Sequence, residues 1–408
     1  MGFPVWIYTV FCPLNEQVLI ICELGQKNTF AKHPYNTYIY AHIIPNKEMS
    51  MFKILYKNRV VLLSLFVIGY SLSVQANDET KGPNGEQATP YTQVSLTQDQ
   101  QDQVKTKNYT AAILMHSTSD WSNALIAGAK DLFSSLNIKV VAVTDAEFDA
   151  NKQKTDVETI MAMKPDILIA LVVDPVSGAA AFRPAVQQGS KLVLISNLPT
   201  GFVHGKDYAG IVTDDLFEMG KIAADLIANA VGPQGKVGFI YHDASYYVTN
   251  QRDKAVLTSL KNHYPNIEIV AKRGIANAND GEAIASALIT QYPDINAIYA
   301  PWDSIAEGVV SATRAAGRKD IKVVTMDLGA ANALDMAKGR NVAGIVTDLP
   351  YDLGKTLARM GALSKLGVDT PAFVTVSASG VTRDNLASAW QKSLRREAPK
   401  SVIKALDQ

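Results

Sequence analysis

Short apolar runs alternate with amphipathic segments along most of the chain after Tyr109. Each run is nearly continuous, a pattern typical of strands buried on both faces of a parallel sheet. The first series of predicted strands covers 110–116, 139–144, 166–173, 191–196 and 208–213. A second series covers 236–241, 267–271, 297–300, 322–326 and 343–347.

The segments between these runs have the periodicity of helices. After the first predicted strand, apolar residues recur at spacings of three and four, at Leu125, Ala129, Leu132, Phe133 and Leu136. Such a stripe predicts a helix that packs on a sheet. Predicted helices 303–316 and 333–338 are each followed by a glycine that can cap them. Two series of strand–helix alternation predict an α/β fold with two doubly wound parallel-sheet lobes.

An earlier apolar run has a different character. Residues 51–76 begin with basic side chains, continue with an apolar core at 60–69, and end with small residues at Val74 and Ala76. This order is typical of a cleaved secretory signal peptide. The apolar core is shorter than the ~20 residues that a membrane span requires. The pattern therefore predicts export.

Fifty residues precede this signal peptide, so we expect translation to start at Met51 or Met49, with 1–50 upstream of the true start. Both cysteines, Cys12 and Cys22, lie in that segment, and the exported product would contain no thiol. We expect a soluble periplasmic protein. Polar residues 77–106 are expected to form a flexible leader.

Charge and motifs narrow the classes of function. The chain has 39 basic and 39 acidic residues, of which six and three lie in 1–76, so the remainder has 33 basic and 36 acidic residues. This near-neutral balance argues against nucleic acid as a partner. No catalytic or dinucleotide-binding motif stands in 77–408, and its histidines lack metal-ligand spacing. We therefore expect no enzymatic activity, no cofactor and no metal site.

In open parallel sheets, ligands bind beyond the carboxyl ends of the strands. The residues that follow the predicted strands are rich in Asp, Asn and Trp. A carboxylate accepts hydrogen bonds from hydroxyls, an amide both donates and accepts, and an indole offers a broad apolar face. These side chains together suit a sugar or a polyol.

Several motifs carry a resemblance to a known family. They are S-T-S-D-W-S-N at 117–123, V-L-I-S-N at 193–197, the segment 211–223, the segment 292–306, V-V-T-M-D at 323–327 and T-D-L-P-Y-D-L-G-K at 347–355. In their order and spacing, residues 107–392 resemble the ribose-binding, type I class of periplasmic sugar receptors for ABC transporters. The resemblance implies two lobes joined by a three-strand hinge, with the ligand between them.

The same resemblance implies the domain boundaries. The N-terminal lobe would comprise 107–215 and 349–376, and the C-terminal lobe 216–348 and 377–392. Residues 393–408 would form a C-terminal tail.

The resemblance also assigns the candidate site. The expected ligand-binding residues are Asp120, Trp121, Asn197, Asn250, Arg252, Trp302, Asp303, Asp327 and Asp348. Among them Trp121 would stack on the ligand and Asp327 would accept its hydroxyls. Simpler roles compete, because Asp120 and Asp303 could only cap helices and Arg252 could only pair with a surface acid.

This site departs from the family pattern. Two basic ligands of a ribose site are replaced at Asn197 and Asn250, while Trp302 and Asp348 are additional. Two indoles suit a pyranose-like ring or a linear polyol. The excess of carboxylates could instead select a partly cationic ligand such as an amino sugar. The sequence leaves these alternatives open.

The implied function is capture of a monosaccharide or related polyol in the periplasm and delivery to an ABC permease. The alternative is a sensor that presents its ligand to a membrane sensor kinase or chemoreceptor. In both cases a monomer would close around the ligand without chemistry.

Overall fold

The computed structural model describes residues 5–11, 17–25, 38–43 and 79–408. The chain divides into two compact units, 1–77 and 78–408. In the first unit, β1 (Val5–Phe11), β2 (Gln17–Gly25) and β3 (Tyr38–Ile43) form an antiparallel sheet. The predicted signal peptide, 51–76, lies outside the described residues, and so does the proposed start.

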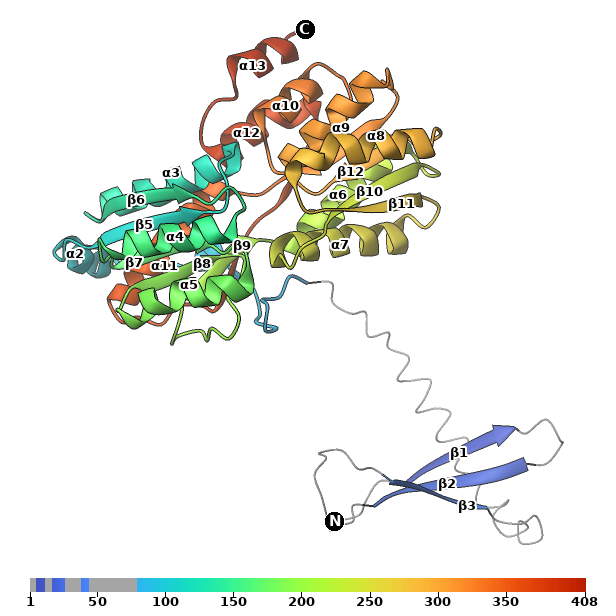
Figure 1. Cartoon of the computed structure of the whole chain (residues 1–408), viewed down its shortest axis with the longest axis horizontal. Coiled ribbons are helices and arrows are strands. Elements are labelled where there is room, and N and C mark those ends of the chain that lie inside the picture. The colour runs from blue at the N-terminus through green and yellow to red at the C-terminus, as the bar shows by residue number, and fades with distance from the viewer. Residues whose placement is uncertain (1–4, 12–16, 26–37, 44–78) are drawn as a thin grey trace. The chain divides into compact units, whose positions relative to one another are not determined.

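The first sheet of the second unit consists of parallel strands in the order β4-β15-β9-β8-β7-β5-β6. They are β4 (Thr89–Pro90), β5 (Thr110–Met115), β6 (Lys139–Asp145), β7 (Ile167–Leu171), β8 (Lys191–Ile195), β9 (Gly210–Asp214) and β15 (Phe373–Val376). Helices α3 (Asp120–Ser135), α4 (Ala150–Met161), α5 (Pro175–Gln187) and α11 (Pro350–Lys365) connect and cover these strands (Figure 1). We call this part the N lobe.

The second sheet has the order β11-β10-β12-β13-β14-β16, and only β16 is antiparallel to its neighbour. Its strands are β10 (Lys236–His242), β11 (Glu268–Ile275), β12 (Ala297–Ala300), β13 (Lys322–Met326), β14 (Val342–Thr347) and β16 (Ser379–Val381). Its helices are α6 (Leu216–Val231), α7 (Tyr247–His263), α8 (Gly281–Gln291), α9 (Asp303–Ala315) and α10 (Ala330–Ala337). We call this part the C lobe.

The chain passes between the two sheets three times, after β9, after β14 and after β15. This connectivity confirms the predicted fold class of two doubly wound lobes with a three-strand hinge. The strand β11 extends beyond its predicted range, to Ile275. The predicted residue boundaries of the lobes stay a prediction.

Parts of the expected leader from residue 79 onward form secondary structure and pack on the N lobe. The helix α2 (Gln98–Lys105) has a capping box formed by Thr97 and Gln100, and Val94 and Val104 are buried in the N-lobe core. The short strand β4 extends the first sheet. The polar composition of 77–106 gave no sign that these two valines pack in the N-lobe core and hold the segment against it.

The C-terminal segment also packs. Helices α12 (Leu386–Leu394) and α13 (Lys400–Leu406) bury Trp390 and Val402 in the C-lobe core. Of the helices in the described ranges, none is at once long enough and apolar enough to cross a membrane.

Helices α3 and α11 touch backbone to backbone, and this contact positions the start of α3. A Cβ on Gly354 would lie 1.9 Å from the carbonyl oxygen of Leu125, and one on Gly128 would lie 1.9 Å from that of Tyr351. Backbone atoms cannot rotate aside as a side chain can. Both positions therefore require glycine for steric reasons.

We predict that Gly354→Ala destabilises the protein by about 3 kcal/mol, because the methyl group forces α3 and α11 apart. Urea unfolding of purified protein measures this. The matched control is Gly178→Ala in α5, where the nearest atom is Cγ1 of the Val172 side chain. If Gly354→Ala and Gly178→Ala lose equal free energy of unfolding, the α3–α11 contact has no specific requirement for glycine.

Candidate functional site

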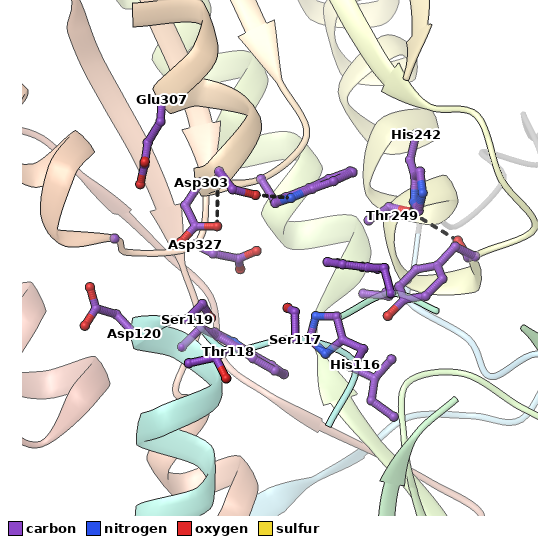
Figure 2. Close-up of a pocket in the computed structure, with 18 of the residues that line it drawn as sticks. His116, Ser117, Thr118, Ser119, Asp120, His242, Thr249, Asp303, Glu307 and Asp327 are labelled. Atoms are coloured by element: carbon purple, nitrogen blue, oxygen red, sulfur yellow. Dashed lines mark hydrogen bonds between the residues drawn. The ribbon is translucent and has the colours of Figure 1, made fainter. Parts of the chain in front are cut away.

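A cavity of about 420 Å³ lies between the lobes, at the carboxyl ends of strands from both sheets (Figure 2). The N lobe contributes 116–121, which follow β5, and Phe148, which follows β6. The C lobe contributes residues from the end of β10 and the first turns of α7, from Trp302 and the first turns of α9, and from Asp327 and 329–331. This is the location that the sequence predicts for a ligand in two doubly wound lobes.

Carboxyl groups gather at one side of the cavity. Figure 2 shows Asp120, Asp303, Glu307 and Asp327 together there. Asp303 is buried, and its Oδ1 accepts a hydrogen bond from the Ser304 backbone N–H at 2.8 Å. Burial, reinforced by the charge of Asp327, raises the pKa of Asp303 to about 8. Partial burial at the cavity rim, reinforced by the charge of Asp120, raises the pKa of Glu307, although this residue remains exposed overall.

One guanidinium lies among these acids. Arg252 is buried on α7, its Nε donates to Asp214 Oδ2 at 2.8 Å, and its Nη1 lies 3.3 Å from Asp327 Oδ2. Burial raises the pKa of Asp327, and Arg252 opposes that shift. Asp327 has a φ of 67°, in the left-handed region that Asp and Asn tolerate better than most residues.

Trp121 connects the cavity to a fully buried carboxyl group. The residue is 7 % exposed, packs in the N-lobe core and also lines the cavity, so the packing and ligand roles are compatible. Its Nε1 donates to Asp348 Oδ1 at 2.9 Å. Asp348 Oδ2 has no hydrogen-bond partner among the described residues, and burial raises the pKa of this group.

Rings line the side of the cavity away from the acids. Phe148 of the N lobe stacks on Trp302 of the C lobe, with centroids 6.1 Å apart and planes 30° apart. The rings of His116 and Phe148 pack edge-on with centroids 4.8 Å apart, and those of His242 and Trp302 pack edge-on with centroids 4.9 Å apart. Tyr246 completes this group. Burial lowers the pKa of both histidines to about 4, so they are neutral at pH 7.

Six of the nine predicted site residues line the cavity: Asp120, Trp121, Arg252, Trp302, Asp303 and Asp327. Asp120 is not the cap of its helix, since Ser119 holds that position. It accepts hydrogen bonds from the Ala330 backbone N–H at 2.9 Å and from Arg396. The ligand-binding roles of these residues stay predictions.

Three predicted residues, Asn197, Asn250 and Asp348, lie outside the cavity lining. Asn197 is buried and bridges the Val172 carbonyl and the Val248 backbone N–H. Asp348 lies behind the indole to which it is bonded.

Asn250 is exposed and bonds to the Ala244 carbonyl instead. It precedes Arg252 by two residues, which corresponds to about 200° around a helix, so the two side chains leave α7 on opposite sides. The arginine therefore reaches the cavity and the asparagine does not.

Sequence reasoning missed several lining residues, including His116, Phe148, His242, Tyr246 and Glu307. His116 directly follows β5 and His242 ends β10, so their positions at strand ends were a signal available in the sequence. Glu307 shares a helix face with Asp303, four residues earlier. Phe148 had no sequence signal, because a turn with positive φ at Glu147 and Phe148 directs its ring to the cavity.

We predict that Trp121→Phe destabilises the protein by about 2 kcal/mol, because it leaves the buried carboxyl of Asp348 without its donor. In an Asp348→Leu background the same change should cost less than about 1 kcal/mol. Urea unfolding of the four proteins measures the coupling. Equal losses in both backgrounds would show that the Trp121–Asp348 bond contributes nothing to stability.

A second prediction concerns pH. Because the pKa of His242 is about 4 in the folded protein and about 6.5 when unfolded, its stabilising contribution is complete above pH 6.5 and is lost as the pH falls toward 4. The stability advantage of the protein over His242→Asn should therefore shrink by up to about 3 kcal/mol between pH 7 and pH 4. Urea unfolding at several pH values tests this, with exposed His263→Asn as control. If the difference in unfolding free energy between the protein and His242→Asn does not change with pH, the interpretation of His242 as a buried neutral imidazole is wrong.

Comparison with known proteins identifies the family. The profile of the periplasmic binding protein domain matches residues 111–365, more than half of the chain. A ribose import binding protein of Salmonella typhimurium is 23% identical over 267 residues, which cover 65% of this chain and 88% of that protein. The corresponding protein of Bacillus subtilis is 27% identical over 217 residues, covering 53% and 68%.

Solved structures agree on the fold. A carbohydrate transporter solute-binding protein from Agrobacterium radiobacter, in complex with D-arabinose, has a TM-score of 0.63 and 25% identity, with 71% of this chain and 99% of that one covered. A solute-binding protein from Bacillus halodurans with bound myo-inositol has a TM-score of 0.61 and 16% identity, with coverages of 70% and 98%. The predicted resemblance is confirmed: the chain belongs to the periplasmic binding protein family, in which its relatives are sugar-binding proteins of the ribose type.

Proposed function

We propose that this protein captures, in the periplasm, a monosaccharide or a related polyol in the cavity between its lobes and delivers it to an ABC permease in the membrane. The observation that carries this proposal is the composition of the cavity. Carboxylates line one side and aromatic rings the other, and both lobes supply each kind. Hydroxyls and C–H faces of one small ring would meet complementary partners.

The size of the cavity supports the same class of ligand. About 420 Å³ falls within the range of small-molecule sites. Among proteins of similar fold, one binds D-arabinose, one myo-inositol and one D-allose, all of them polyhydroxylated. The cavity therefore suits a compact polyhydroxylated ligand.

Contacts across the cavity support capture by closure. Phe148 stacks on Trp302, and Asp120 accepts a hydrogen bond from the Ala330 backbone N–H, so each contact joins an N-lobe element to a C-lobe element. A ligand held by both lobes stabilises the closed arrangement over an open one. The membrane partner would recognise that closed form, and no step of this cycle requires bond chemistry or a cofactor.

A thermal-shift screen of the purified protein against pentoses, hexoses and polyols tests the capture step. A ligand specific for the folded state stabilises it by ~2.7 kcal/mol at a hundredfold excess over its Kd. We expect at least one sugar or polyol to raise the midpoint. If none does, and calorimetry detects no binding, the proposal fails. Loss of uptake of that ligand in cells lacking this protein would separate transport from sensing.

We predict the affinity order wild type, Asp327→Asn, Asp327→Ala for the ligand found in this screen, with about a tenfold loss for Ala. Asn keeps one side-chain oxygen and tolerates the positive φ, whereas Ala keeps neither advantage. Calorimetry measures affinity and a melt without ligand measures stability. The control is Asp320→Ala, an exposed acid paired with Arg318 outside the cavity lining. If both variants lose stability yet keep wild-type affinity, Asp327 does not contact the ligand.

A further inference from the structure

The cavity lining has more carboxyl groups than cationic side chains. Four carboxyl groups line it, those of Asp120, Asp303, Glu307 and Asp327, and Arg252 is the single cationic residue of its lining. Arg252 is already shared between Asp327 and Asp214, and Asp120 is paired with Arg396. Asp303 and Glu307 have no ion pair within the described part of the chain. These two residues are therefore the uncompensated acids of the site.

The carboxyl of Asp303 is nine-tenths buried and has a free oxygen. Its residue is 9% exposed, and Oδ1 accepts the Ser304 backbone N–H. Oδ2 accepts no hydrogen bond from any described residue. A Cβ on Gly329, which lines the cavity, would lie 2.9 Å from this Oδ2. The free oxygen thus lies at the cavity wall.

The other lining residues supply no counter-charge. His116 and His242 are neutral at pH 7 because burial lowers their pKa to about 4. The remaining large groups are rings, and the faces of Trp121, Phe148 and Trp302 carry negative electrostatic potential that favours a cation. Burial without a cation keeps Asp303 largely protonated at pH 7, because its pKa is about 8. A positive group on the ligand beside its free oxygen would favour the ionised form and supply the charge partner that no described residue provides.

We propose that the preferred ligand carries a protonated amine on a polyhydroxylated ring, as amino sugars and aminocyclitols do, and that Asp303 and Glu307 bind this amine. The inference rests on the proposed function and narrows its ligand class. The two acids lie four residues apart on one face of α9, at Asp303 and Glu307, so both can approach a single ammonium group. The ring hydroxyls would remain with Asp327 and Arg252.

Calorimetry on matched triplets tests the proposal. Each triplet contains a neutral sugar, its 2-amino derivative and its N-acetylated amine, in the glucose, galactose and mannose series, at about pH 6.5. A further pair compares myo-inositol with an amino-inositol. We expect at least one amine to bind about tenfold more tightly than its neutral partners. If neutral sugars bind and no amine is preferred, the inference is overturned while the proposed function stands. If neither neutral nor amino carbohydrates bind, both fail.

Charge-removing variants test the assignment of the two acids. Asp303→Asn and Glu307→Gln should each lower affinity for the preferred amine about tenfold more than affinity for its neutral parent. Asp320→Asn removes an exposed carboxylate outside the cavity lining and is the matched control. Glu307 is exposed, so its variant carries the test if Asp303→Asn fails to fold. Equal losses for the amine and for its parent in both variants would overturn the assignment.

Discussion

The buried guanidinium of Arg252 connects the hinge of this molecule to its cavity. Its Nε binds Asp214 at the end of β9, where the chain first leaves the N lobe, and its Nη1 faces Asp327 at the end of β13. Breaking a buried ion pair by removing one partner typically costs 3–5 kcal/mol, because the other charge remains buried. The guanidinium therefore holds a hinge acid and a cavity acid in fixed positions.

On the N-lobe side, contacts between α3 and α11 fix the position of Trp121. Helices α3 and α11 touch through Gly128 and Gly354, and the bond from Trp121 to Asp348 joins the starts of the same two helices. A steric contact and a hydrogen bond thus set the position of one indole. That indole forms part of the cavity wall, so packing deep in the N lobe determines the shape of the site.

The division of the cavity into an acidic side and an aromatic side follows from these constraints. The acids come from the first turn of α3, the first two turns of α9 and the end of β13, whereas Phe148 and Tyr246 come from connections on opposite lobes. A ligand that satisfies both sides must present polar hydrogens at one end and an apolar face at the other. Selectivity within carbohydrates would then depend on how many positive charges the acidic side accepts.

The sequence by itself determined the architecture, since buried parallel strands must be apolar runs and the covering helices must carry apolar stripes. It also located Trp121, Arg252, Trp302 and Asp303 at strand ends or on the helices that follow them, where the sheet topology requires a site. Only the tertiary structure separated Asn250 from Arg252, because opposite sides of one helix face different surroundings. It alone placed Asp348 behind an indole and brought Phe148 onto Trp302. Those positions depend on a positive-φ turn and on contacts between residues far apart in the chain, and local sequence patterns do not encode such contacts.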